Sequence, residues 1–207
     1  MVTREGDWTG LRHPAQLHRC TTRAHALPFP AMTADHAAPT PAPDPDRAAL
    51  KAALAGRGEY ELFACDPALA DTAAFCAAYG FAMEDSANTI IVVGKGAEPV
   101  YAACVVLATH RLAVNQVVKV RFGRKSSFAS PEETQALTGH AIGGVTVFGL
   151  PEGLPVWVDA AVMERERIVL GGGSRSWKVI APSSILLTLP GVEVVLGLAN
   201  PAPPRED

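Results

Sequence analysis

Residues 138–150 constrain the fold of this chain most strongly, because they place four glycines among apolar residues in the order Thr-Gly-His-Ala-Ile-Gly-Gly-Val-Thr-Val-Phe-Gly-Leu. Glycine has no Cβ, so such a backbone adopts conformations closed to other residues and brings its N–H groups against a ligand. We predict a ligand-facing loop here and call it the glycine loop. A turn with only a structural role is the alternative.

Boundary signals flank the glycine loop on both sides. Ser130, Pro131 and Glu133 provide an N-cap, a proline at the first helical position and a capping-box glutamate, which predicts a helix over 131–138 that ends at Gly139. On the other side, residues 155–159 alternate like a strand. A second glycine-rich turn, residues 171–176, joins two more predicted strands at 167–170 and 177–180.

The rest of the chain alternates short helices and short strands. Residues 47–55 are strong helix formers, and residues 71–79 have an aspartate cap and the stop signal Gly80. Two apolar runs predict a hairpin of buried strands. The alternation predicts an α+β fold with a mixed sheet. The runs lie at 89–93 and 100–107, a helix is predicted at 111–122, and short strands are predicted at 60–63 and 126–129.

Several motifs in this order resemble the YbaK/EbsC-type aminoacyl-tRNA deacylases, which are related to the editing insertion domain of bacterial prolyl-tRNA synthetase. The resemblance covers residues 59–198 and implies a compact, partly closed mixed β-sheet surrounded by short helices, with the helix at 71–79 leaning over the substrate pocket. Each motif is weak alone, and their joint order and spacing carry the resemblance. The motifs are Ala129-Ser-Pro-Glu-Glu133, Thr138-Gly139, Gly143-Gly-Val-Thr146, Phe148-Gly-Leu150, Val158-Asp159 and Gly172-Gly-Ser-Arg175 with Lys178.

Two positions depart from the family pattern. The functional lysine of the family falls on Asn88, which can hydrogen-bond but carries no charge. In the family's Gly-x-x-x-Pro loop, Val147 stands where a proline would fix φ and remove a donor. We therefore expect catalysis by positioning and substrate assistance instead of a charged side chain, and an altered choice of amino acid.

The resemblance implies hydrolysis of an aminoacyl ester on the terminal ribose of tRNA. Such an ester is already activated, so the protein need only position a water or the adjacent ribose hydroxyl and stabilise the oxyanion. Backbone N–H groups from Gly143 to Thr146 are the expected donors. The predicted catalytic residues are Asn88, Gly143 and Thr146, and the predicted substrate-binding residues are Gly144, Val145, Val147, Phe148, Asp159, Arg175 and Lys178.

Other roles remain open for several of these side chains. Asp159 either binds substrate or caps the turn that follows it. Arg175 and Lys178 either meet a phosphate or face solvent. His140, beside the glycine loop, is either a base or a structural residue.

Five basic residues lie within fifteen positions, although the net charge is −3. Local charge decides contact with nucleic acid more than the total does, so these residues are either a phosphate track or a solvated helix face. No aromatic platform accompanies them, and we expect contact mainly with the acceptor end of tRNA. The five are Arg111, Lys119, Arg121, Arg124 and Lys125.

The sequence does not indicate a membrane protein, a disulfide-stabilised protein or a metal-dependent protein. No apolar run approaches the roughly 20 residues that span a bilayer, and no secretory signal is recognisable, so we expect a cytoplasmic protein. The four cysteines form no Cys-x-x-Cys pair and are expected to be buried free thiols. We expect neither metal nor cofactor. The cysteines are Cys20, Cys65, Cys76 and Cys104.

Residues 1–45 are rich in proline and alanine and are predicted to be a disordered extension. Met32 raises the alternative that translation starts there. Residues 46–200 form the predicted editing domain, and residues 201–207 a disordered tail. With 48% hydrophobic residues the chain can supply the core of one such domain.

Three functions remain. The first is a free-standing deacylase that clears mischarged tRNA in trans, with aminoacyl-tRNA and a synthetase as partners. The second is a non-catalytic descendant that binds aminoacyl-tRNA or an amino acid derivative. In the third, the turn at 171–175 binds a nucleotide phosphate, although neither Gly-x-x-x-x-Gly-Lys nor Gly-x-Gly-x-x-Gly is present.

Overall fold

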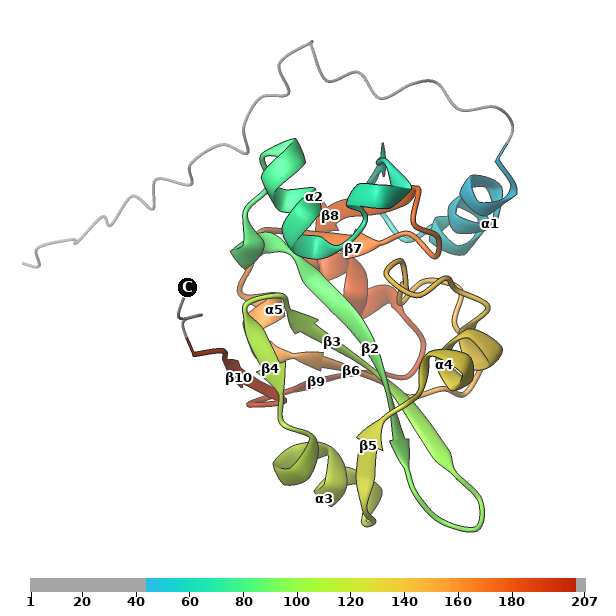
Figure 1. Cartoon of the computed structure of the whole chain (residues 1–207), viewed down its shortest axis with the longest axis vertical. Helices are drawn as coiled ribbons and strands as arrows, with labels where there is room; N and C mark the ends of the chain where they lie inside the picture. Colours follow the sequence, from blue (N-terminus) through green and yellow to red (C-terminus); the bar gives the residue numbers. More distant parts are fainter. Residues whose placement is uncertain (1–43, 204–207) are drawn as a thin grey trace, which may run out of the picture. The chain divides into compact units, whose positions relative to one another are not determined.

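The computed structural model describes residues 44–203, and Figure 1 shows the arrangement of their helices and strands. The predicted disordered extension therefore lies outside the described residues up to position 43, as do residues 204–207 of the predicted tail. The chain order is α1 (Pro45–Leu54), β1 (Glu61–Ala64), η2 (Pro67–Leu69), α2 (Thr72–Tyr79), η3 (Met83–Asp85), β2 (Ala87–Gly94), β3 (Val100–Leu107), β4 (His110–Leu112), η4 (Val114–Val118), α3 (Lys119–Phe122), β5 (Ser126–Phe128), α4 (Pro131–Thr138), β6 (Val156–Asp159), α5 (Ala160–Met163), β7 (Arg167–Gly171), β8 (Trp177–Pro182), η5 (Ser183–Thr188), β9 (Val192–Val195) and β10 (Ala199–Pro201).

A five-stranded mixed sheet forms the centre of the fold, in the order β5-β2-β3-β6-β9. The predicted hairpin is confirmed, since β2 and β3 pair antiparallel from Ala87 opposite Leu107 to Gly94 opposite Val100. β6 joins β3 in parallel and β9 joins β6 in parallel, because each is reached through a helix-containing crossover. The mixed α+β class predicted from the sequence is confirmed.

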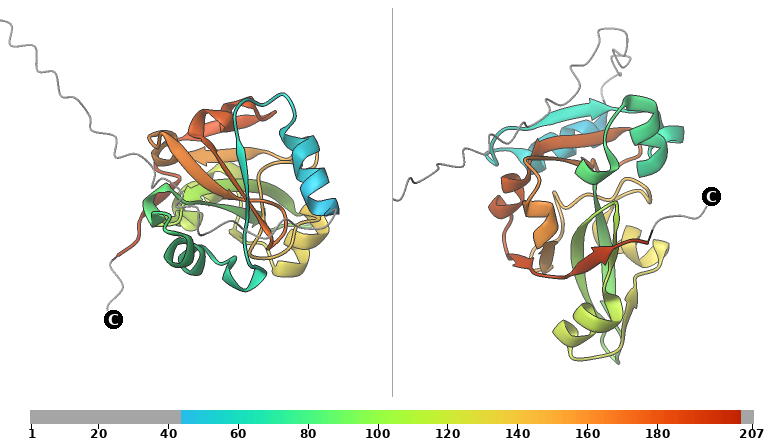
Figure 2. Two further views of the ribbon diagram at one scale, coloured as in Figure 1. Left: turned by 90° about the horizontal axis from the view of Figure 1, so that it is seen from above. Right: turned by 90° about the vertical axis from the view of Figure 1, so that its left-hand side faces the viewer.

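A second, antiparallel sheet of three strands has the order β1-β8-β7 and carries the second glycine-rich turn between its last two strands. It meets the five-stranded sheet where Ser86, just before β2, bridges to Val169 on β7. The right-hand view of Figure 2 shows the three-stranded sheet across one end of the long β2–β3 hairpin. The line along which β2 and β7 meet brings residues of both sheets to one place.

Local signals placed most helix ends correctly. The capping box of α4 is present, with the Ser130 side chain accepting from the Glu133 amide and Glu133 accepting from the Ser130 amide. Gly139 and Gly80 end α4 and α2 in the left-handed conformation. Because glycine adopts that conformation without a Cβ clash, these two stop signals could be read from the sequence.

The helix predicted over residues 111–122 is wrong in its first part. His110–Leu112 is instead the strand β4, where Arg111 pairs with Asn200 of β10. Only Val114–Val118 and Lys119–Phe122 are helical, and the first of these segments is a π-helix. Backbone pairing with a distant strand overrode the local helical pattern, and no local signal reveals such a partner.

Three clusters of buried apolar side chains hold the layers together. The largest lies between the two sheets, and the second lies on the far face of the five-stranded sheet against η4 and α3. In the third, Phe63, Phe75, Tyr79 and Phe81 pack edge-to-face or stacked and fix α2 on the three-stranded sheet. Burying one large apolar side chain completely stabilises the fold by about 1.5–3 kcal/mol, so these aromatic contacts hold α2 firmly on the three-stranded sheet.

The described cysteines are free and buried, as predicted, and Cys20 lies outside the described residues. Burial raises the pKa of the Cys104 thiol to about 12, so this side chain stays protonated and behaves as a core residue. Within residues 44–203, no helix combines the length and apolar character that crossing a membrane requires.

Candidate functional site

A cavity of about 230 Å³ lies where β2 and β7 meet the start of α2 and the glycine loop. Four of the predicted site residues line it: Asn88, Gly143, Val145 and Lys178. Since these residues come from segments far apart in the sequence, the fold itself assembles the site. We call it the polar cavity, and the polar side chains of its lining are Asp71, Thr72, Ser86, Asn88, Thr89 and Lys178.

The glycine loop is fixed by direct backbone contact with the second glycine-rich turn. The Gly173 amide donates to the Gly144 carbonyl at 2.7 Å, and the Ala141 amide donates to the Gly173 carbonyl at 2.9 Å. A Cβ on Gly144 would lie 2.1 Å from the Ser174 carbonyl oxygen, and one on Gly171 would lie 2.2 Å from that of Val145. Only glycine permits this approach, so the geometry of the glycine loop depends on glycines both in the loop and in the second glycine-rich turn.

Two backbone amides of the glycine loop are available to a ligand. The Gly144 amide already donates to the Ala141 carbonyl at 2.9 Å. Within residues 44–203, the amides of Gly143 and Val145 donate to no acceptor, and both residues line the polar cavity. Gly143 also has a φ of 85°, which places it in the region that favours glycine. This pair has the character of an oxyanion-binding site.

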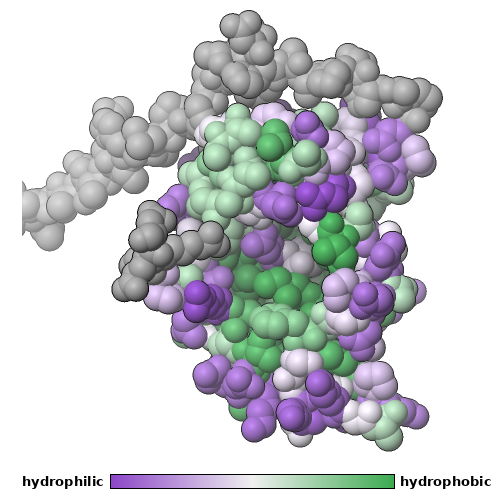
Figure 3. Space-filling model, in the orientation of Figure 1, coloured by the Kyte–Doolittle hydropathy of each residue, from purple (hydrophilic) through white to green (hydrophobic). Residues whose placement is uncertain are grey.

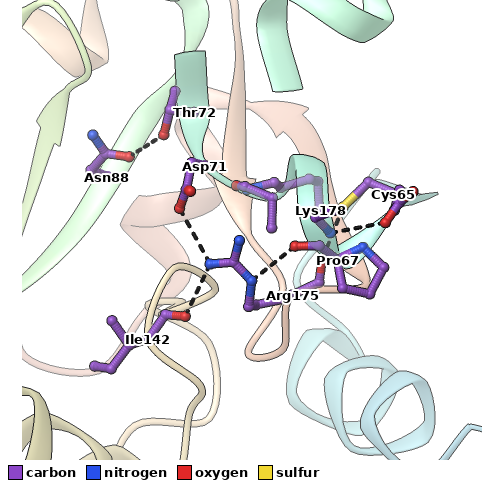
Figure 4. Close-up of polar contacts among 11 residues, drawn as sticks. Cys65, Pro67, Asp71, Thr72, Asn88, Ile142, Arg175 and Lys178 are labelled. Atoms are coloured by element: carbon purple, nitrogen blue, oxygen red, sulfur yellow. Dashed lines mark hydrogen bonds and ion pairs between the residues drawn. The ribbon is translucent and has the colours of Figure 1, made fainter. Parts of the chain in front are cut away.

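Asn88 and two threonines form the polar wall of the cavity on the β2 and α2 side. The Thr72 hydroxyl donates to the Asn88 side-chain oxygen at 2.9 Å, which leaves the amide nitrogen of Asn88 as a donor (Figure 4). Thr89 Oγ1 is buried and has no hydrogen-bond partner among the described residues. A buried unpaired hydroxyl costs about 1–3 kcal/mol, so Thr89 indicates a place that a polar ligand or water completes.

The sequence analysis missed Thr72 and Thr89 as site residues. A weak signal for Thr89 exists, because it is a polar residue next to Asn88 at the start of the apolar run of β2. Thr72 had no such signal, since its position at the first turn of α2 is ordinary for threonine. Its contact with Asn88 follows only from the packing of α2 over β2.

Arg175 joins three segments around the mouth of the polar cavity. Its Nε donates to the Pro67 carbonyl at 2.9 Å and its Nη1 lies 3.2 Å from Asp71 Oδ1, with a longer contact of 3.5 Å to the Ile142 carbonyl (Figure 4). Asp71, the N-cap residue of α2, makes no side-chain cap hydrogen bond, and its carboxylate is directed at Arg175 instead. Arg175 therefore ties η2 and α2 to the glycine loop.

Lys178 points inward from β8 and is only 6% exposed, so of the two alternatives for this residue the one in which it faces solvent is wrong. Its Nζ donates to the Ala70 carbonyl at 2.6 Å and lies 5.2 Å from the centre of the Phe75 ring. Burial lowers the pKa of Lys178, because an ammonium loses hydration energy inside the protein. The polar cavity is therefore lined by a lysine as well, which the substitution at position 88 had not suggested.

Six predicted residues lie outside the lining of the polar cavity, namely Gly144 and Arg175, described above, and Thr146, Val147, Phe148 and Asp159. Val147 and Phe148 are in the main apolar core, and Thr146 is buried with its hydroxyl accepting from the Phe148 amide at 3.4 Å. Both oxygens of Asp159 accept backbone hydrogen bonds, one from Ala161 at 3.0 Å and one from Ala199 at 2.8 Å. Asp159 thus has the capping role that the sequence analysis kept as an alternative.

His140 belongs to a second cavity, of about 360 Å³, on the side of the glycine loop that faces α1. We call it the histidine cavity. Its lining includes Thr146, Gly149 and Gly173, while Asn88 and Lys178 line only the polar cavity. His140 Nδ1 is buried without a partner in the described part of the chain, and burial lowers the pKa of the imidazole. His140 is therefore not placed to act as a base on a ligand in the polar cavity.

The basic cluster lies at the other end of the five-stranded sheet, where hydrophilic residues gather around α3 in Figure 3. Arg121 pairs with Glu193 and lies over the Trp157 ring, 4.6 Å from its centre. Arg124 donates to the Glu98 carbonyl at 3.1 Å. Among residues 44–203 no group of three or more His, Cys, Asp or Glu side chains could hold a metal ion.

Comparison with known proteins supports the family resemblance that the sequence motifs predicted. The profile of the aminoacyl-tRNA editing domain matches residues 66–183, more than half of the chain. The crystal structure of a proposed trans-editing enzyme for prolyl-tRNA synthetase has a TM-score of 0.65 and 24% identity, covering 74% of this chain and 97% of its own. A hypothetical protein of known structure has a TM-score of 0.66 and 23% identity, covering 73% of this chain and 99% of its own. At these identities the two structures establish the fold.

Proposed function

The chain belongs to the aminoacyl-tRNA editing domain family, and we propose that it is a deacylase that hydrolyses the ester of mischarged aminoacyl-tRNA in trans. The observation that carries this proposal is the pair of unengaged amides at Gly143 and Val145 in the wall of the polar cavity. The similarity to a proposed trans-editing enzyme along almost all of that protein's length supports action in trans.

The proposed reaction adds water across the ester bond. The aminoacyl group occupies the polar cavity with its carbonyl oxygen against the amides of Gly143 and Val145. Attack by water forms the new C–O bond, the bond to the ribose oxygen breaks, and that oxygen takes a proton. Free amino acid and tRNA are released. Fixed amides of this kind stabilise a tetrahedral oxyanion by about 3 kcal/mol each.

No side chain in the lining is an evident general base. Asp71 is the acidic residue of the lining, and its carboxylate is engaged by Arg175. The proposal therefore relies on positioning, in which the neighbouring ribose hydroxyl assists the attacking water. The Asn88 amide is available to orient that hydroxyl or the amino group, because Thr72 fixes its oxygen.

We propose that the partner is the acceptor end of aminoacyl-tRNA, met in the cytoplasm, with a synthetase as a further partner. In the basic cluster Arg121 is paired with Glu193 and Arg124 donates to the Glu98 carbonyl, so contact with the body of tRNA contributes little in this proposal. The discrimination between amino acids is modest in this proposal, since a methylene in such a pocket is worth only about 1–3 kcal/mol.

Single-turnover hydrolysis of a panel of aminoacyl-tRNAs by the full chain tests the function, each compared with spontaneous hydrolysis. The proposal requires acceleration of one or a few members. Gly143→Ala serves as the variant, because its Cβ would lie 2.1 Å from Arg175 Nη1 at a φ of 85° and would disturb the amide pair. We expect a loss of about 10²-fold or more in rate. A rate equal to that of the unaltered protein would remove the loop from the mechanism.

A non-catalytic binding module is the second candidate, favoured by the neutral Asn88 at the position of the family lysine. In that case the panel shows no acceleration, while aminoacyl-tRNA or an aminoacyl-adenosine analogue still binds. The two functions therefore differ in the same experiment once binding is measured beside hydrolysis.

A further inference from the structure

Lys178 occupies the central strand of the three-stranded sheet, directly beneath α2. It pairs with Phe63 of β1 on one side and with Gly171 of β7 on the other. Because Gly171 has no side chain, this cross-strand neighbour admits the glycine-loop backbone beside the lysine, since a Cβ there would lie 2.2 Å from the Val145 carbonyl oxygen. Its side chain reaches the Ala70 carbonyl, just before the cap of α2. The position is fixed by the sheet and by α2 together.

The charge of this lysine is not balanced within the described part of the chain. No carboxylate lies within 4.0 Å of its Nζ among residues 44–203, and its one hydrogen bond there is to the Ala70 carbonyl. A buried ammonium is costly unless it is paired, so proteins rarely retain one without a use. Two of the three N–H donors of an ammonium at this position have no acceptor among residues 44–203, and Lys178 lines the polar cavity.

Asn88 and Lys178 stand on different strands of the same cavity, and Asn88 is neutral. Resting on the proposed function, we propose that Lys178 supplies the positive charge of the polar cavity and binds an anionic oxygen at the reacting end of the substrate. Because Asn88 is neutral, the cation of this cavity is contributed from β8. Two oxygens have this chemistry, the phosphate of the terminal nucleotide and the oxyanion formed during hydrolysis.

The groups that face Lys178 come from every element packed around it. Cys65 after β1, Cys76 on α2, Asp71 at the cap of α2 and Arg175 on the second glycine-rich turn all act on its titration. Arg175 lowers the pKa of Lys178 and Asp71 raises it, while burial has the largest effect and lowers it. Arg175 is already engaged by Asp71 and Pro67, which leaves Lys178 as the cation directed into the lining.

A charge-relocation experiment tests the proposal. Lys178→Met removes the charge, Lys178→Arg retains it, and the double variant Lys178→Met with Asn88→Lys moves it to the other wall. Lys51→Met, at an exposed position of α1, is the matched control. We expect single-turnover hydrolysis to fall about 10²-fold in Lys178→Met, to recover at least ten-fold in the double variant and to stay unchanged in the control. Circular dichroism and thermal unfolding establish that each variant is folded.

The kinetic form of the loss identifies the oxygen. A fall in the maximal rate at saturating protein indicates the oxyanion, and a fall in affinity with an unchanged maximal rate indicates the phosphate. Either result supports the proposal. A purely structural lysine predicts instead that Lys178→Met, once folded, hydrolyses as fast as the unaltered protein or that relocation restores nothing, and either outcome overturns the proposal.

Binding separates failure of this inference from failure of the proposed function. Amide-linked 3′-alanylamino-, serylamino- and prolylamino-adenosine 5′-monophosphates cannot be hydrolysed, and their dissociation constants are measured for all five proteins. If the unaltered protein hydrolyses no aminoacyl-tRNA, the proposed function fails. Lys178-dependent binding of an analogue, restored by the double variant, then still supports the charge role. Absent or Lys178-independent binding in that case contradicts it.

Discussion

The two cavities on either side of the glycine loop differ in chemistry more than in size. The histidine cavity is larger, at about 360 Å³ against 230 Å³, yet the one imidazole in its lining has a pKa lowered by burial. The polar cavity is lined by a lysine, by a threonine whose buried hydroxyl has no partner among residues 44–203, and by two residues whose amides donate to no acceptor there. The comparison teaches that the polar groups lining a cavity, and not its volume, distinguish the candidate site from its neighbour.

Gly144→Ala would break the comparison most severely, because it affects the loop that separates the cavities. The new Cβ would lie 2.1 Å from the Ser174 carbonyl oxygen, against backbone that cannot swing away. We expect a loss of about 3 kcal/mol in the free energy of unfolding, together with loss of hydrolysis. Urea denaturation checks the first and single-turnover kinetics the second.

Gly153→Ala is the control for Gly144→Ala. It also replaces a loop glycine, at a φ of 80° but with no atom within 4 Å of the new Cβ. Its expected cost is about 1 kcal/mol, from backbone strain alone. Equal losses in the two variants would mean that the contact between the glycine runs contributes nothing.

Thr89→Val sharpens the comparison from the side of the polar cavity. The substitution keeps the shape of the side chain and removes a hydroxyl that has no partner among residues 44–203. We expect equal or higher stability, by about 1 kcal/mol, since a buried unpaired polar group is removed. Hydrolysis should fall about ten-fold if this hydroxyl binds substrate. A stable variant with undiminished activity would show that Thr89 is a packing residue.

His140→Gln probes the histidine cavity and should have the smallest effect on catalysis, within about two-fold of the unaltered rate. Because burial lowers the pKa of His140 from 6.5, the unfolded chain binds its proton more readily than the folded one. His140 therefore destabilises the protein increasingly as the pH falls below 6.5. Between pH 8 and pH 5 the midpoint temperature of thermal unfolding should therefore fall less in His140→Gln than in the unaltered protein. A ten-fold loss of rate would instead place His140 in the mechanism.

The sequence predicted best those features that depend on neighbouring residues. The capping box at Ser130 and the stop at Gly139 were correct because both signals act within one helical turn. The strand at His110–Leu112 was missed because its partner, β10, is almost ninety residues further along the chain. Local pattern contains no information about such a pairing.

The same contrast between local and distant determinants applies to the residues of the candidate site. Gly143 and Asn88 were recognisable because each belongs to a motif, and the fold brings both to one cavity. The inward direction of Lys178 was not recognisable, since a lysine after a glycine-rich turn is usually exposed and only the docking of α2 buries it. The burial of Val147 in the main core likewise depends on packing between the two sheets.

The backbone contact between the two glycine runs limits how this domain can diversify. A side chain at position 144 or 171 would collide with a carbonyl oxygen, so selection cannot tune substrate choice at either position without losing the loop. Variation is open instead at Val145 and on the strand faces of β2 and β7, which line the polar cavity without such a collision. We therefore expect a new amino acid preference to evolve through substitutions in the side chains that line the cavity, while the backbone contact between the glycine loop and the second glycine-rich turn stays constant.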